Sequence, residues 1–190
     1  MTSIYKSPAA GRVAVSWLNL DGDEQSDLTV HGGVDKAVYA YPSEHYAYWR
    51  DELPDSQLDW GAFGENLTTS GLLETEVRVG DRLRIGTAEF TITQPRMPCF
   101  KLGIKFGRDD IIKRFLESRR SGFYLKVERE GEVGAGDTIE LSQTQDQSVT
   151  ITEFVGLYGN AHPDPERLRR AIAQRATPES WRDYFRKRLS

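Results

Sequence analysis

Short runs rich in β-branched and aromatic residues, separated by turn residues, fill the chain from residue 12 to about residue 141. Gly80-Asp81 and Gly86-Thr87 separate three of these runs at hairpin spacing, and Gly136-Asp137 precedes the last one. This pattern is typical of antiparallel β-structure, and many short strands with close turns favour a closed barrel or a sandwich. The expected strands are residues 12–17, 76–79, 82–85, 89–93, 124–128 and 138–141.

Two helices are predicted to interrupt the strands, one from Pro42 to about Asp51 and one beginning at Asp109-Asp110. The polar stretch 143–148 then resembles a linker, and three short helices are expected after it, over 149–158, over 165–175 and after Thr177-Pro178. We therefore expect a mainly β domain over residues 1–143, a linker over 144–148 and a three-helix domain over 149–190.

The composition excludes several classes of site. One cysteine in 190 residues allows no disulfide within the chain and no zinc or iron-sulfur site made of several thiolates of this chain. The sequence has neither a long apolar run nor a signal peptide, so we expect a cytoplasmic protein without membrane contact. Residues 151–190 carry 8 Lys and Arg against 5 Asp and Glu, whereas residues 1–150 carry 17 against 24. An acidic body argues against broad nucleic-acid binding, although the basic tail allows a local contact.

Cys99 is the first candidate for chemistry. It lies in Gln94-Pro-Arg-Met-Pro-Cys-Phe-Lys101, where two cations flank one sulfur and two prolines stiffen the chain. Nearby cations favour the thiolate, which attacks electrophiles and binds metals. A lone cysteine can equally be a small buried apolar residue.

Two glycine-bearing segments are further candidates. In His31-Gly-Gly-Val-Asp-Lys36, paired glycines allow backbone amides to approach a ligand, and Lys36 can contact a phosphate. In the segment 61–68, Asn66 can donate and accept hydrogen bonds. Each segment is also explained by an ordinary turn before a strand.

The ordered set of motifs resembles the MOSC domain, named after the C-terminal domain of molybdenum cofactor sulfurase, and within it the bacterial YiiM group linked to resistance to 6-N-hydroxylaminopurine. The resemblance covers residue 4 to about 141, and the tail is similar to that group's three-helix domain. The motifs are His31-Gly-Gly-x-Asp-Lys, Tyr41-Pro-x-Glu-His-Tyr, Phe63-Gly-Glu-Asn-Leu-Thr, Gly80-Asp, Gln94-Pro-Arg-x-Pro-Cys-x-Lys, Gly122-Phe-Tyr and a final Gly-Glu-Val-Gly-x-Gly-Asp.

The resemblance implies a MOSC-type β-barrel that binds a pyranopterin molybdenum cofactor, with Cys99 as the protein ligand to molybdenum. It implies that Lys36 contacts the phosphate end of the cofactor and that Arg96 contacts its phosphate or pterin. It also places Asn66, Tyr124 and His31 near the cofactor, His31 without an assigned role.

The implied activity is reduction of small N-hydroxylated compounds such as hydroxylaminopurine-type base analogues. Because the chain has no flavin fingerprint, electrons are expected from a separate flavin or iron-sulfur reductase. Two alternatives stay open: a cysteine-based carrier of sulfur or of the cofactor without its own redox turnover, and a DNA-associated or interaction module using the basic tail. A homodimer is a further expectation.

Members of the YiiM group carry an additional N-terminal segment beginning with a strand, and this sequence begins where that segment would end. We expect that Met1 is not the natural start, or that the segment has been lost or removed. A missing strand would leave a barrel edge unpaired beside the cofactor.

Overall fold

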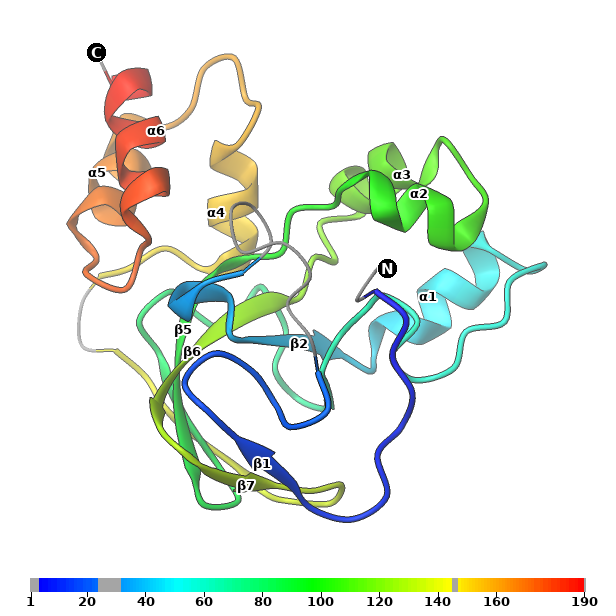
Figure 1. Cartoon of the computed structure of the whole chain (residues 1–190). Helices are drawn as coiled ribbons and strands as arrows, with labels where there is room; N and C mark the ends of the chain where they lie inside the picture. The colour runs from blue at the N-terminus through cyan, green and yellow to red at the C-terminus, as the bar shows by residue number, and fades with distance from the viewer. Residues whose placement is uncertain (1–3, 24–31, 145–146, 190) are drawn as a thin grey trace.

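The computed structural model describes residues 4–23, 32–144 and 147–189, which form a curled mixed sheet with helices at both ends (Figure 1). Six strands have the order β3-β2-β6-β5-β4-β8, and β1 pairs with β7 in a small separate sheet. All pairs are antiparallel except β2 with β3, so the antiparallel prediction is wrong for that pair alone. The strands are β1 Val13–Val15, β2 Val38–Pro42, β3 Leu67–Thr69, β4 Arg82–Ile85, β5 Ala88–Pro95, β6 Phe123–Arg129, β7 Gly131–Val133 and β8 Ile139–Ser142.

Five of the six predicted strands are present, whereas the strand predicted over residues 76–79 is wrong. The carboxylate of Asp81 accepts a hydrogen bond from the backbone amide of Arg78 at 2.8 Å, which folds this segment into a turn. Arg78 keeps a single isolated bridge to Thr150. Val77 and Val79 are nevertheless buried, so the apolar alternation reports burial here rather than a strand.

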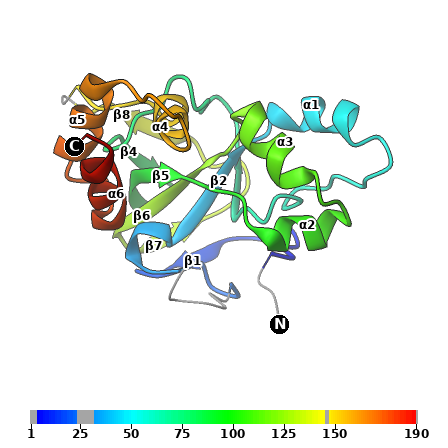
Figure 2. The ribbon, with the colours of Figure 1, turned by 90° about the horizontal axis from the view of Figure 1, so that it is seen from above.

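Helices cover the two ends of the sheet (Figure 2), with α1, α2 and α3 at one end and α4, α5 and α6 at the other. The helix predicted from Pro42 begins at His45, because Pro42 still belongs to β2 and pairs with Thr69 of β3. The helix after Cys99 was not predicted. The helices are η1 Val34–Lys36 (a 3-10 turn), α1 His45–Glu52, α2 Phe100–Phe106, α3 Ile111–Ser118, α4 Ile151–Leu157, α5 Pro165–Ala173 and α6 Glu179–Leu189.

Strand β2 separates two apolar clusters. Val38 and Ala40 point into the cluster inside the curled sheet, whereas Tyr39 and Tyr41 point into an aromatic cluster with α1 and α3. Because successive side chains of a strand face opposite sides, a strand between two cores is buried at every position, and β2 is. This strand therefore fixes the aromatic cluster, on which the candidate site rests, to the barrel.

The three predicted C-terminal helices are present and pack on the barrel. Phe154 of α4, Leu168 of α5 and Phe185 of α6 are buried in the same cluster as the sheet interior. The indole of Trp181 also donates a hydrogen bond of 2.6 Å to the side chain of Gln94 on β5. The division into two domains at residues 144–148 stays a prediction, since the helices and the sheet share this core.

None of the helices in the described ranges has the length and apolar character needed to cross a bilayer.

Candidate active site

Cys99 lies at the junction of β5 and α2. β5 ends at Pro95, and Cys99 is the N-cap residue of α2, with an extended backbone at φ −130° and ψ 172°. Its carbonyl accepts the backbone amide of Leu102 at 2.9 Å, and its thiol is free and half-buried. The strand-to-helix junction thus presents the sulfur at the surface, which a cysteine serving only as core filler would not require.

Arg96 is buried beneath Cys99, with 6% of its surface exposed. The central carbon of its guanidinium lies 5.3 Å from the ring centroid of Tyr39 and 5.8 Å from that of Phe115, distances typical of cation–π contacts. The guanidinium also forms a hydrogen bond with Tyr124 and interacts electrostatically with the Cys99 sulfur. Its Nη1 is buried and has no hydrogen-bond partner in the described part of the chain.

Aromatic rings and a phenol compensate the positive charge of a buried guanidinium only in part. Withdrawal from water disfavours an ion unless an opposite charge or full hydrogen bonding replaces the hydration. Burial lowers the pKa of the Arg96 guanidinium, but its interactions with Tyr39, Tyr124 and Cys99 raise it above its ordinary value, and none of these three groups is a carboxylate. An anionic group bound beside Cys99 would supply the missing negative charge and an acceptor for Nη1.

The phenols around Arg96 are held neutral. Burial raises the pKa of the Tyr124 phenol. The charge of Arg96 lowers this pKa, and the Cys99 sulfur raises it. Burial also raises the pKa of Tyr39 well above its ordinary value, and its hydroxyl donates a hydrogen bond of 2.8 Å to the carbonyl of Ser121. Neither phenol supplies the negative charge that Arg96 lacks.

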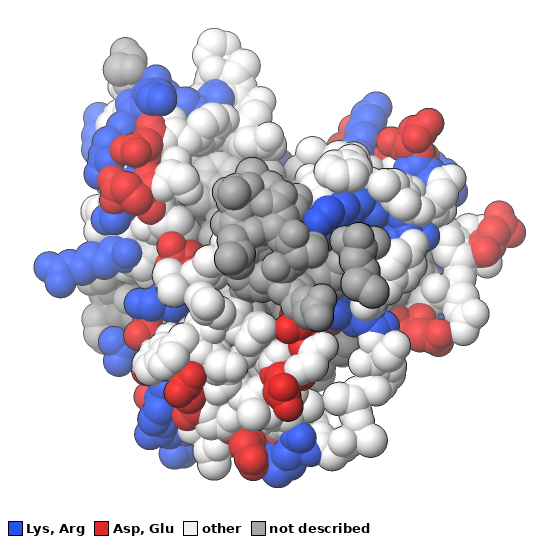
Figure 3. Space-filling model, in the orientation of Figure 1, with Lys and Arg blue, Asp and Glu red and all other residues white. Residues whose placement is uncertain are grey.

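Lys105 of α2 is a second cation near Arg96, and it was not predicted. Its Nζ donates hydrogen bonds to the carbonyls of Ile4 at 2.9 Å and Gly61 at 2.8 Å. Burial lowers the pKa of Lys105 to about 8; Glu65 raises it, and the charges of Arg96 and Lys6 lower it further. Figure 3 shows Lys and Arg side chains gathered beneath α2 and α3 on this face.

Lys36 lies at the end of η1, directly before β2. Burial lowers the pKa of its ammonium, and the neighbouring Asp35 raises it. Gly33 precedes η1 with φ 96°, a conformation that favours glycine, and its carbonyl accepts the amide of Lys36 at 3.0 Å. His31 lies outside the described residues.

The side chain of Asn66 forms hydrogen bonds to other parts of the chain. Its Oδ1 accepts the backbone amide of Tyr39 at 2.9 Å, and its Nδ2 donates to Asp23 at 2.6 Å. The neighbouring Glu65 is buried and accepts the amides of Gly61 and Phe63 at 2.9 and 3.1 Å. The segment 61–68 thus holds Tyr39 beneath Arg96.

The structure therefore brings Cys99, Arg96 and Tyr124 together, and it adds Tyr39, Phe115 and Lys105, which sequence spacing did not indicate. Tyr39 and Phe115 looked like ordinary core residues, which they also are. Lys105 could have been found only by predicting α2, for which Gly107 was a signal, since its φ of 61° ends the helix in the left-handed conformation.

Residues 27–140 match the MOSC domain family. The chain belongs to this family. The match includes the Gly-Gly-Val-Asp-Lys segment, the loop of Asn66 and the segment of Cys99, so the predicted family is confirmed on the residues that indicated it.

Three curated proteins show how far the similarity extends. The chain is 37% identical over 187 residues to the Bacillus subtilis protein named "Uncharacterized protein YflK", with 98% of this chain and 84% of that protein covered. It is 36% identical over 190 residues to Protein YiiM of Escherichia coli, with the same coverage. It is also 36% identical over 143 residues to a Gibberella moniliformis protein named "Reductase", with 74% of this chain and 25% of that protein covered.

The fold matches a solved structure over nearly the whole chain. The crystal structure of YiiM from Geobacillus stearothermophilus superimposes with a TM-score of 0.86 at 35% identity, covering 98% of this chain and 89% of that one. The MOSC-type barrel with inserted helices and C-terminal helices is therefore confirmed as the fold.

Proposed function

We propose that this protein is a molybdenum-cofactor-dependent oxidoreductase that reduces N-hydroxylated compounds, with electrons from a separate reductase. Membership in the MOSC family and the similarity to a fungal protein named reductase support this proposal. The observation that carries it is Arg96, a buried cation that interacts with the half-buried Cys99 thiol and whose Nη1 has no hydrogen-bond partner among the described residues.

The residues present fit the cofactor. A pyranopterin molybdenum cofactor combines a soft metal with an anionic phosphate, and the site combines a half-buried thiol with Arg96, whose buried Nη1 has no hydrogen-bond partner in the described residues. Cys99 would hold the molybdenum, and Arg96 would hold an anionic or hydrogen-bonding part of the cofactor. When bound, the cofactor supplies the two-electron chemistry that converts an N–OH substrate, with two protons, into N–H and water.

The chain's own residues would orient the cofactor and neutralise its negative charge. The rings of Tyr39 and Phe115 hold the Arg96 guanidinium from behind, and the Tyr124 hydroxyl fixes it from the side. Lys36 would bind the phosphate end, as the family resemblance implies, and Lys105 adds positive charge. Asn66 acts indirectly by holding the amide of Tyr39.

The proposal is tested by molybdenum analysis of wild-type, Cys99→Ser and Met97→Leu proteins, each produced in a host that makes the cofactor. Met97 is a neighbouring, similarly exposed residue and serves as the control. We expect about one molybdenum per chain in wild type and in Met97→Leu, and almost none in Cys99→Ser. Reduction of 6-N-hydroxylaminopurine with an artificial electron donor should follow the molybdenum content.

Absence of molybdenum and of turnover in every variant would contradict the proposal. Because Cys99 is a free, half-buried thiol, a sulfur carrier is the second candidate. It predicts metal-free protein with an added mass of one sulfur that disappears in Cys99→Ser.

A further inference from the structure

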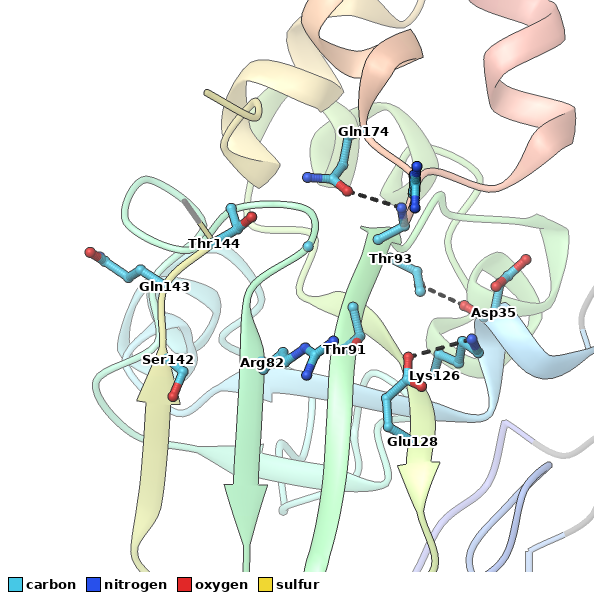
Figure 4. A pocket seen from close by; sticks show the side chains of 13 residues that line it. Asp35, Arg82, Thr91, Thr93, Lys126, Glu128, Ser142, Gln143, Thr144 and Gln174 are labelled. Atoms are coloured by element: carbon cyan, nitrogen blue, oxygen red, sulfur yellow. Dashed lines mark hydrogen bonds and ion pairs between the residues drawn. The ribbon is translucent and has the colours of Figure 1, made fainter. Parts of the chain in front are cut away.

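A cavity lies on the outer face of the sheet, between the strands and the turn that joins α5 to α6 (Figure 4). Its volume is about 470 Å³, within the range of small-molecule pockets. Its walls come from β4, β5, β6 and β8, from η1 and from residues 174–176. Cys99, Arg96 and Lys36 are not among the residues that line it, although η1, which carries Lys36, forms part of its wall.

A neighbouring rung of the sheet shows how this face normally balances its charges. Glu140, Arg84, Glu89 and Arg129 stand opposite one another across four strands, with alternating sign. Arg84 contacts the carboxylate of Glu140 at 3.0 Å through its Nε, and Arg129 contacts Glu89 at 3.0 Å. Each cation of this rung has a carboxylate from the adjacent strand.

The rung that lines the cavity contains no carboxylate. Ser142, Arg82, Thr91 and Lys126 occupy the corresponding positions, so Arg82 stands between two hydroxyls. Figure 4 shows the Arg82 guanidinium pointing toward Thr91. Within the described ranges no carboxylate forms an ion pair with Arg82, whereas Lys126 contacts Glu128 at 3.4 Å.

The hydroxyl of Thr91 is a second, independent sign of a ligand. Thr91 has 7% of its surface exposed, and its Oγ1 has no hydrogen-bond partner in the described part of the chain. Buried hydroxyls are normally satisfied, because an unsatisfied one costs free energy. A group that accepts a hydrogen bond in the cavity would satisfy Thr91 and neutralise Arg82 together.

The α5–α6 turn supplies a cation to the opposite wall. Gln174 packs closely on Gly80. A Cβ atom added to Gly80 would lie only 2.6 Å from Nε2 of Gln174. Arg175 follows Gln174 and lines the cavity. Two acids also line it, and Figure 4 shows both Asp35 and Glu128 near Lys126, at the far side of Thr91 from Ser142.

We propose that this cavity binds the phosphate group of a small molecule, held by Arg82 and Arg175 with the Thr91 hydroxyl as a donor. Guanidinium groups match the geometry of phosphate oxygens, and a hydroxyl can donate to a third oxygen. The inference does not depend on the molybdenum cofactor, because none of these three residues belongs to the candidate active site.

The test is calorimetric titration with inorganic phosphate and with adenosine monophosphate, at constant ionic strength. The variants are Arg82→Gln and Thr91→Val, and Arg84→Gln is the matched control on the same face of the same strand. We expect at least about a tenfold weaker affinity in both variants and unchanged affinity in the control. Thr91→Val replaces an unsatisfied hydroxyl by a methyl of the same shape, so it should fold at least as well as wild type.

The two probes separate a free phosphate from a phosphate ester, since tighter binding of the nucleotide would indicate an ester. Because the cations near Cys99 can bind the same probes, the titrations are repeated in an Arg96→Met background. Binding that survives Arg96→Met and is lost on adding Arg82→Gln supports the proposal. No detectable binding, or equal affinities in Arg82→Gln, Thr91→Val and Arg84→Gln, overturns it.

Discussion

Two arginines in different regions of the molecule, Arg84 and Arg96, differ in exposure and in the partners of their guanidinium groups. On the outer face of the sheet, Arg84 is exposed and two carboxylate oxygens of Glu140 accept from it. Beneath Cys99, Arg96 is buried among aromatic rings and a phenol, with Nη1 left without a partner in the described residues. An exposed cation needs little compensation, because water solvates it, whereas a buried one needs much. The buried guanidinium of Arg96 thus needs more compensating negative charge than that of Arg84 but has fewer charged partners in the described residues, which supports the ligand proposed beside Cys99.

The largest expected effect comes from Arg96→Met. The substitution keeps the apolar volume beside Tyr39 and removes the charge that we assign to the cofactor. We expect the affinity for the molybdenum cofactor to fall at least about 30-fold, in line with the loss of a buried charge contact. Molybdenum content after dialysis measures this, and Arg84→Gln is the control.

The stability of Arg96→Met to urea also tests the contrast between Arg96 and Arg84. Without cofactor, Arg96→Met should be as stable to urea as wild type or more stable, because a desolvated and partly unsatisfied cation has been removed. A large loss of stability in the cofactor-free protein would show that the rings and Tyr124 already satisfy Arg96, and the contrast with Arg84 would then disappear.

Lys105 gives an intermediate effect that depends on pH. Its pKa is about 8 in the folded chain against an ordinary value of 10.5. Between these values the unfolded chain keeps a proton that the folded chain has released, so the unfolding free energy rises with pH. Relative to Lys105→Met, wild type should gain about 1 kcal/mol from pH 8 to 10.5, after allowance for solvent screening.

Urea unfolding of both proteins at several pH values measures this difference. The other titrating groups are common to the two chains and cancel. A difference that stays constant with pH, or falls as pH rises, would contradict the assignment of Lys105 as a destabilised cation.

The smallest effect is expected for Arg84→Gln. The variant loses an exposed ion pair to Glu140, and such pairs contribute little. We expect the melting temperature to change by less than about 2 °C, and by less still at high salt. A larger change would mean that the paired rung stabilises the sheet more than its exposure suggests.

Local signals predicted much of this fold and the centre of its site. The limits of β4 at 82–85 follow from Gly80-Asp81 and Gly86-Thr87, and Cys99 with Arg96 stood out through flanking charge and proline. Tyr39 and Phe115 could not be assigned to the site, because their approach to Arg96 depends on how α3 packs against β2. The segment 76–79 was misjudged because its pairing with residues 149–151 is limited to one bridge, at Arg78, before α4 begins at Ile151.

Strand β2 has a consequence for how the molecule unfolds. Val38 and Ala40 belong to one apolar cluster, and Tyr39 and Tyr41 belong to the other. Neither cluster can open without withdrawing alternate side chains of a backbone that the other still holds. We therefore expect the amides of this strand to exchange with solvent only through global opening, so that the barrel and the aromatic support of Cys99 form one cooperative unit.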